Sequence, residues 1–273
     1  MSHFEFSTAS RIIFGAGAHK QIAQIAKGFG AHAFVVVDVT PERAQAILDG
    51  LEEAGVPAMV YAVTGEPSVE SVTAGVEQAK AAGADVIVAV GGGSVIDTGK
   101  AVAALSTNRR PIMDYLEVVG QGIPLTEPSM PLIAAPTTAG TGAEVTRNAV
   151  IKVPEERVKV SLRSATMMPA AAVVDPELTL TVPPNVTAST GLDALTQCFE
   201  PYVSCQSNPL TDGIAREGMQ RAARSLRRAY EDGKDLAART DMAIASLFGG
   251  LALANAKLGA VHGFAAVLGG MYP

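Results

Sequence analysis

The feature that most constrains the fold is an alternation of two hydrophobic periods over residues 15–93. Short β-branched runs alternate with segments of helical spacing, in the order 19–27, 34–38, 41–55, 58–63, 68–82 and 84–90. Strands separated by helices of about 10 to 15 residues form βαβ units and build a parallel sheet. The second helix is expected to begin at Pro41, because proline suits a first helical turn. A further apolar run at 131–136 continues the same sheet.

The pattern changes after this sheet. Runs at 148–153 and 158–163 are separated by four residues and predict a β-hairpin. After Pro183 and Pro184 the strand signals stop, and Ala-rich helical spacing continues to the end. We therefore predict an α/β domain over residues 1–180 and a helical domain over residues 181–273.

Composition argues against several classes of protein. Hydrophobic residues make up 48% and charged residues 18%, a balance typical of a folded chain. The net charge of -6 and the lack of a basic block argue against a nucleic-acid or anionic-membrane partner. The N-terminus lacks the pattern of a signal peptide, and Cys198 and Cys205 suit a reduced compartment, so we expect a cytoplasmic protein. The apolar stretch 258–273 is interrupted by glycines and predicts a buried helix rather than a membrane span.

A glycine-rich turn, GGGSVIDTGKA at residues 91–101, follows an apolar strand and opens a helical pattern. Glycines let the backbone approach a ligand closely, Ser94 can cap the helix, and free N–H groups at a helix start attract anions. The turn therefore predicts a phosphate cradle. A tight β-to-α turn that serves only close packing is the alternative.

Two further segments follow predicted strands. Asp38 ends a strand, where an acid can bind the ribose diol of a dinucleotide and repel a 2′-phosphate, but it could equally be a helix cap. The loop PTTAGTGAE at residues 136–144 carries Thr137, Thr138 and Thr141 beyond a strand end, where ligands of open α/β sheets bind. A solvated turn whose hydroxyls bond their own backbone is the alternative for this loop.

Together with VVDPELT (173–179) and TGLDALTQCFEPYVS (190–204), these segments resemble the iron-containing (group III) alcohol dehydrogenases. That family is related to glycerol dehydrogenase, maleylacetate reductase and dehydroquinate synthase. The resemblance implies a dehydroquinate synthase-like fold, a homodimer, and NAD and a divalent metal in the cleft between an α/β domain and an all-helical domain. The positions that it assigns to the dinucleotide are Asp38, Gly92, Gly93, Ser94, Asp97, Thr137, Thr138 and Lys159.

The resemblance assigns the metal to Asp193, Gln197 and His262, with Asp193 and His262 as the catalytic pair. This sequence departs from the family here, because Gln197 replaces a histidine and an amide oxygen is the weaker ligand for Fe²⁺ or Zn²⁺. The neighbouring Cys198 points away around the helix and is expected in the core. A histidine common in the family is Ala266, and a fourth ligand would fall past the last residue. The chain therefore resembles a C-terminally truncated member with a weakened metal site.

The predicted function is an NAD-dependent oxidoreductase that moves a hydride between the nicotinamide and a small alcohol, aldehyde or ketone. NADP is disfavoured by Asp38. A dinucleotide-binding remnant without catalysis is the alternative, since two of four metal-ligand positions differ or are absent. A hydrolase on the same scaffold is the least favoured reading, because the sequence has no GxSxG elbow.

Overall fold

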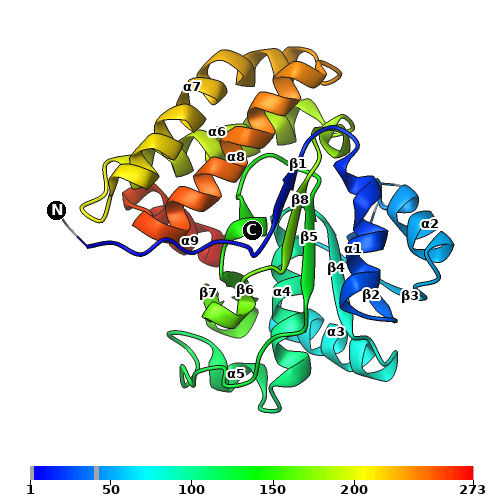
Figure 1. Cartoon of the computed structure of the whole chain (residues 1–273). Helices are drawn as coiled ribbons and strands as arrows, with labels where there is room; N and C mark the ends of the chain where they lie inside the picture. The colour runs from blue at the N-terminus through cyan, green and yellow to red at the C-terminus, as the bar shows by residue number, and fades with distance from the viewer. Residues whose placement is uncertain (1–2, 40–42, 273) are drawn as a thin grey trace.

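The computed structural model describes residues 3–39 and 43–272, which form an α/β half followed by a helical half (Figure 1). The first half contains a six-stranded sheet with the order β1-β8-β5-β4-β2-β3, and every pairing in it is parallel. Its strands are β1 Ile12–Phe14, β2 Ala33–Asp38, β3 Ala58–Val63, β4 Val86–Gly91, β5 Leu132–Pro136 and β8 Ala171–Val174. The parallel sheet predicted from the alternating periods is therefore confirmed.

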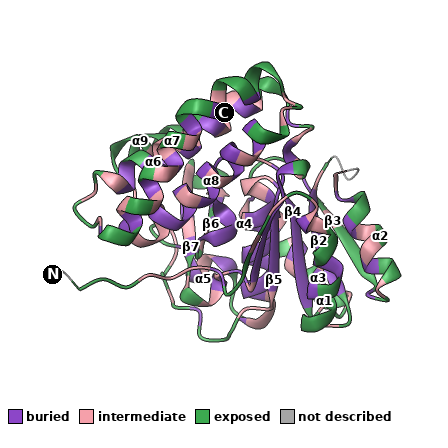
Figure 2. Cartoon of the chain, turned by 45° about the horizontal axis from the view of Figure 1, so that its top comes forward, coloured by how far each residue is buried: buried purple, intermediate pink, exposed green. Residues whose placement is uncertain are grey.

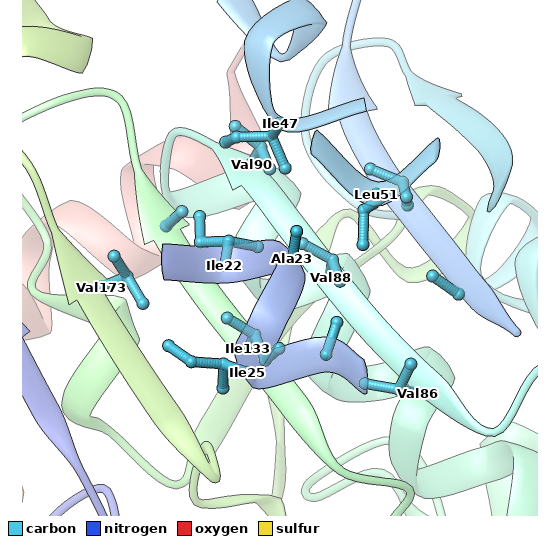
Figure 3. Packing of buried hydrophobic residues seen from close by; sticks show 14 of the residues in the cluster. Ile22, Ala23, Ile25, Ile47, Leu51, Val86, Val88, Val90, Ile133 and Val173 are labelled. Atoms are coloured by element: carbon cyan, nitrogen blue, oxygen red, sulfur yellow. The ribbon is translucent and has the colours of Figure 1, made fainter. Parts of the chain in front are cut away.

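Helices cover both faces of the sheet because its strands are apolar on both sides. The short 3-10 helix η1 (Ala18–Gln21), α1 (Ile22–Phe29) and α2 (Gln45–Glu53) pack on one face, where Figure 3 shows Ile22, Leu51 and Val88 as parts of one core. The predicted start of α2 at Pro41 lies outside the described residues.

The opposite face of the sheet is covered by α3 (Val69–Ala81) and α4 (Gly93–Thr107). Neighbouring strand residues such as Val88 and Ala89 point to opposite faces and enter the two separate cores. A one-turn helix, α5 (Ile112–Tyr115), lies in the chain between α4 and β5.

Strand β1, at one edge of the sheet, and strand β8, between β1 and β5, were not predicted. They have three and four residues, too few for a periodic signal, and they pair with each other through Ile12 and Ala172, far apart in the chain. The predicted hairpin is present as β6 (Asn148–Val153) and β7 (Val158–Arg163), an antiparallel pair outside the main sheet.

The helical half consists of α6 (Pro184–Tyr202), α7 (Pro209–Glu231), α8 (Leu236–Ala256) and α9 (Ala260–Met271). Helices α6, α7 and α8 pack together through small residues such as Ala222, Ala245 and Cys198. Helix α8 is long and apolar enough to cross a membrane, but 61% of its apolar window is buried in the protein. Figure 2 shows buried residues along α8. Its composition therefore reflects its place between the two halves of the protein.

The expectation of a buried helix over 258–273 is wrong for α9. Within this helix only Gly270 is buried, while Val261, Phe264 and Val267 are exposed. The physical reason is that α9 meets the rest of the protein mainly at its two ends. His262 contacts α6 near its start, and Gly270 packs against β7 near its end.

The two halves meet at a backbone contact between Gly142 and Gly250. Gly142 has a φ of 58° in the loop after β5, and Gly250 lies in α8. A Cβ added at Gly142 would lie 2.5 Å from the Cα of Gly250, and one added at Gly250 would lie 2.8 Å from the Cα of Gly142. Because both neighbours are backbone atoms, neither position has room for a side chain.

We predict that Gly250→Ala lowers the free energy of unfolding by about 1 to 3 kcal/mol, the usual cost of overpacking. Gly213→Ala is the matched control, because Gly213 is exposed in α7 with no atom within 4 Å of an added Cβ. That change should instead stabilise the protein by about 0.5 to 1 kcal/mol through helix propensity. Urea denaturation measures both, and an unchanged stability of Gly250→Ala would contradict the contact.

Candidate active site

The glycine-rich turn lies where β4 ends at Gly91 and α4 begins at Gly93. The N-cap of α4 is Gly92, and no side chain caps this helix. The expectation that Ser94 caps it is wrong, because Gly93 is already helical and Ser94 therefore lies inside the first turn. The first N–H groups of the helix are thus left to bind a ligand, as the predicted phosphate cradle requires.

The space around this turn explains its glycines. Gly92 has a φ of -73°, which any residue can adopt, so backbone conformation does not require glycine there. A Cβ at Gly92 would meet its nearest atom, Thr138 Oγ1, at 3.4 Å, an ordinary contact. At Gly93 a Cβ would meet Thr141 Oγ1 at 2.9 Å, which is too close. Gly92 therefore leaves the cradle open. Gly93 also allows the loop of residues 136–144, the threonine loop, to approach.

The loop after β5 stands directly over the cradle. The backbone N–H of Thr137 donates to Gly91 O at 2.9 Å and joins the two strand ends. Thr137 is 1% exposed, and its hydroxyl has no hydrogen-bond partner among the described residues. A buried hydroxyl without a partner is costly, so this atom fits a bound ligand.

Asp38 lies at the carboxyl end of β2, as predicted. Its carboxylate lies 3.5 Å from the Arg43 guanidinium, which also donates to Thr181 O at 3.4 Å. An aspartate at this place suits a ribose diol, whereas a nearby arginine suits a 2′-phosphate. The sequence analysis did not single out Arg43, because its relation to Asp38 depends on the turn between β2 and α2.

Both carboxylate oxygens of Asp97 bind other groups of the protein. One oxygen accepts from the N–H of Val150 at 2.9 Å, and the other lies 3.4 Å from Lys100 Nζ. Lys100 is fully buried and also donates to Thr146 Oγ1 and to Asn148 O, each at 2.8 Å. The pair therefore fastens α4 to β6, and the sequence analysis missed Lys100.

Glu144 is buried beside the same pair. Burial raises the pKa of Glu144 to about 7 despite the positive charge of Lys100. Burial also raises the pKa of Asp97 and lowers that of Lys100, against their mutual attraction. These groups show how strongly water is excluded between α4 and the hairpin.

The predicted metal-binding side chains come together at the contact of α6 with α9. His262 Nε2 lies 3.1 Å from Asp193 Oδ1, and Gln197 Nε2 donates to Asp193 Oδ2 at 2.9 Å. Gln197 Nε2 also lies 3.2 Å from Gly140 O in the threonine loop. The pKa of His262 is raised, chiefly by its hydrogen bond to Asp193. Cys198 is fully buried in the core, as expected.

Glu200 belongs to this cluster and was missed in the sequence. Its carboxylate contacts His262 Nδ1 at 2.6 Å and accepts from the N–H of Val261 at 2.7 Å. Burial alone would raise the pKa of Glu200, but these hydrogen bonds lower it overall. A carboxylate on one ring nitrogen orients the other, so Glu200 directs Nε2 of His262 toward Asp193. The spacing of Asp193, Gln197 and Glu200 on one helix face was an available signal.

The side chains present can accept a cation. Asp193 Oδ1 and His262 Nε2 lie close enough to bind one ion together, and carboxylate and imidazole are common ligands of Fe²⁺ and Zn²⁺. The Oε1 atom of Gln197 is buried and has no hydrogen-bond partner in the described residues. This oxygen is therefore available as a further ligand. Because the amide nitrogen of Gln197 now faces Asp193, this oxygen can serve only after the amide turns over.

The threonine loop links the cradle to this cluster. Thr141 lies against Gly93 on one side of the loop, while Gly140 O accepts from Gln197 on the other. A neighbouring cavity of about 690 Å³ is lined by His262 on the helical side and by Lys159 on β7. Lys159 is also paired with Glu66 at 2.5 Å. The fold thus assembles residues of the predicted dinucleotide and metal groups around one region.

A second group of possible metal ligands lies apart from this region. His19 Nδ1 contacts Asp175 Oδ2 at 2.5 Å, and Glu177 is nearby. Asp175 also accepts from the backbone N–H groups of His19 and Glu177, so it serves as a cap for both segments.

Comparison with known proteins identifies the family of this chain. The profile "Iron-containing alcohol dehydrogenase" matches residues 9–176, and "Fe-containing alcohol dehydrogenase family, C-terminal" matches residues 187–273. Alcohol dehydrogenase 4 of Saccharomyces cerevisiae is 42% identical over 266 residues, which cover 95% of this chain and 68% of the yeast protein.

Comparison with solved structures gives the same result as comparison of sequences. A crystal structure of 1,3-propanediol oxidoreductase has a TM-score of 0.94 at 35% identity, covering 99% of this chain and 71% of that one. Sulfoacetaldehyde reductase from Bifidobacterium kashiwanohense, in complex with NAD⁺, has a TM-score of 0.91 at 32% identity, covering 98% and 71%. The resemblance inferred from the sequence is confirmed, and the chain belongs to the iron-containing alcohol dehydrogenase family.

Proposed function

We propose that this protein transfers a hydride between NAD(H) and a small alcohol, aldehyde or ketone. Its family and its relatives make it an alcohol oxidoreductase. The observation that carries the finer proposal is the threonine loop, which contacts both the glycine cradle and the Asp193 cluster. The NAD⁺ complex of the related sulfoacetaldehyde reductase supports NAD as the dinucleotide.

Each group of residues has a separate task in this proposal. The N–H groups of Gly93 and Ser94 bind the pyrophosphate, and Asp38 binds the adenosine ribose. Asp193 and His262 hold a divalent metal, and Glu200 orients His262 for it. When bound, such an ion supplies Lewis acidity that polarises the substrate oxygen and lowers the pKa of an alcohol.

A dinucleotide-binding protein without catalysis is the second candidate. Gln197 favours it, because the amide nitrogen of Gln197 donates to Asp193 instead of presenting a ligand to an ion. NADH binding without oxidation of any alcohol, measured in the presence of excess Fe²⁺ or Zn²⁺, would select this candidate.

The cradle is tested by Gly92→Ala. The new methyl group makes only an ordinary contact with Thr138, so folding should be unaffected, but it enters the space meant for the pyrophosphate. We expect NADH to bind at least about tenfold more weakly, a change of about 1.4 kcal/mol. Gly28→Ala on α1 is the control, because an added Cβ there has no atom within 4 Å. Unchanged NADH fluorescence titrations for Gly92→Ala would remove the cradle from the proposal.

Dinucleotide choice is tested at Asp38. In Asp38→Gly the guanidinium of Arg43 no longer faces this carboxylate and becomes available to a 2′-phosphate. The ratio of NADPH to NADH affinity should then rise by about tenfold, or about 1.4 kcal/mol. Adding Arg43→Gln to the same variant should cancel most of that gain. If Asp38→Gly leaves the ratio as it was, the assignment of Asp38 to the ribose is incorrect.

The metal site is tested by Gln197→His. Imidazole in place of the amide should strengthen Zn²⁺ binding by about 10- to 100-fold, the scale on which ligand-shell changes act. The control is Gln45→His on α2, because Gln45 also donates to an aspartate four residues away, Asp49, but on an exposed surface. Metal content after dialysis should be substoichiometric in the unmodified protein and should rise in Gln197→His alone. Stoichiometric, chelator-resistant metal in the unmodified protein would contradict the weakened site.

A further inference from the structure

The cavity beside His262 has an excess of positive charge. Its wall includes four cationic side chains and two carboxylates, which are Arg147, Lys159, Arg163, Lys257, Glu5 and Glu66. Its volume of about 690 Å³ is in the range of small-molecule sites. Apolar side chains such as Val150 and Leu253 form other parts of the wall, so the cavity suits a short aliphatic molecule with a charged end.

Two of the four cations are already neutralised. Lys159 is paired with Glu66 at 2.5 Å, and Arg163 with Glu117 at 3.1 Å. Arg147 and Lys257 form no ion pair with any side chain in residues 3–39 and 43–272. The lining does not include Gly92, Gly93 or Thr138, so these two cations are not part of the predicted pyrophosphate cradle.

Lys257 is held in a conformation that lysine normally avoids. It ends α8 with φ 64° and ψ 176°, a backbone region occupied almost exclusively by glycine. Such a conformation costs a side-chain-bearing residue about 1 to 3 kcal/mol. Glycine would satisfy the turn between α8 and α9 better, so the backbone geometry of the turn gives no reason for a lysine at this position.

We propose that this cavity recognises the anionic end of the substrate through Lys257 and Arg147. The substrate class is a short-chain alcohol or aldehyde that carries a carboxylate or a sulfonate, with its oxygen toward His262 and its anion toward these two cations. The proposal rests on the proposed function and narrows it. It also gives the apolar part of the wall a role, because the aliphatic chain between the two ends contacts Val150 and Leu253.

The test compares two probes of equal chain length, 4-hydroxybutyrate and 1,4-butanediol. Calorimetric titrations are run on the full chain with and without saturating NAD⁺. We expect the hydroxy acid to bind at least about tenfold more tightly than the diol, a difference of about 1.4 kcal/mol. Equal affinities would overturn the proposal. Because the arm without NAD⁺ does not depend on the dinucleotide, failure of the proposed function is seen separately, as absence of NADH binding.

Lys257→Gly gives a signature that a purely structural role cannot produce. It should raise the melting temperature by relieving the backbone, and should reduce the preference for the hydroxy acid by about fivefold or more. Arg147→Gln should reduce the preference without raising the melting temperature. Arg157→Gly is the matched control, because Arg157 is also a cation at positive φ, 55°, but does not line the cavity. It should leave the preference unchanged.

Two outcomes of this series overturn the proposal. In the first, Lys257→Gly and Arg147→Gln keep the full preference for the hydroxy acid. In the second, both variants weaken NADH binding and leave the probe preference intact, which would assign the cations to the dinucleotide.

Discussion

The contact between the backbones of Gly142 and Gly250 places the helical half against the sheet. It fixes α8 on the loop that follows β5, and this loop is the same one that lies over the start of α4. The geometry of the candidate site depends on this contact. With α8 in place, α6 brings Gln197 within hydrogen-bonding distance of Gly140 O, and the turn after α8 brings His262 to Asp193. The close approach of the two backbones, which only glycine permits, thus determines where the glycine-rich turn and the Asp193 cluster lie relative to each other.

The sheet could be predicted because each of its longer strands is a β-branched run buried on both faces, bounded by helical segments. Strands β1 and β8 could not, since their few residues acquire strand geometry by pairing with segments distant in the chain, β1 with β8 and β8 also with β5. Composition also failed for α9, whose apolar residues predict burial. Burial depends on what packs against a helix, and that information is not contained in its own residues.

In the candidate site, too, some residues could be predicted from the sequence and others could not. The family resemblance singled out Asp193, Gln197 and His262, and the spacing of the first two placed them on one face of α6. Glu200 and Lys100 were missed although both are buried charges with several partners. Their roles depend on segments distant in sequence, namely the start of α9 for Glu200 and β6 for Lys100. A buried charge is tolerated only with such partners, so tertiary structure is needed to recognise its role.

The cluster around Asp193 illustrates how a substitution is accommodated. Gln197, where the family resemblance implies a histidine, donates its amide N–H to Asp193, while His262 is held between Asp193 and Glu200. In this form the carboxylates are compensated by hydrogen bonds. A metal must therefore compete with a satisfied network, and this competition, together with the weaker amide ligand, explains why binding should be weak.

The most direct test of this account is a crystal structure of the protein grown with NAD⁺ and Zn²⁺, with anomalous data at the zinc edge. The account predicts pyrophosphate density at the N–H groups of Gly93 and Ser94, beside Thr138. It also predicts a partially occupied anomalous peak between Asp193 and His262. A dinucleotide bound elsewhere on the sheet, or zinc bound at His19 and Asp175 instead, would contradict it.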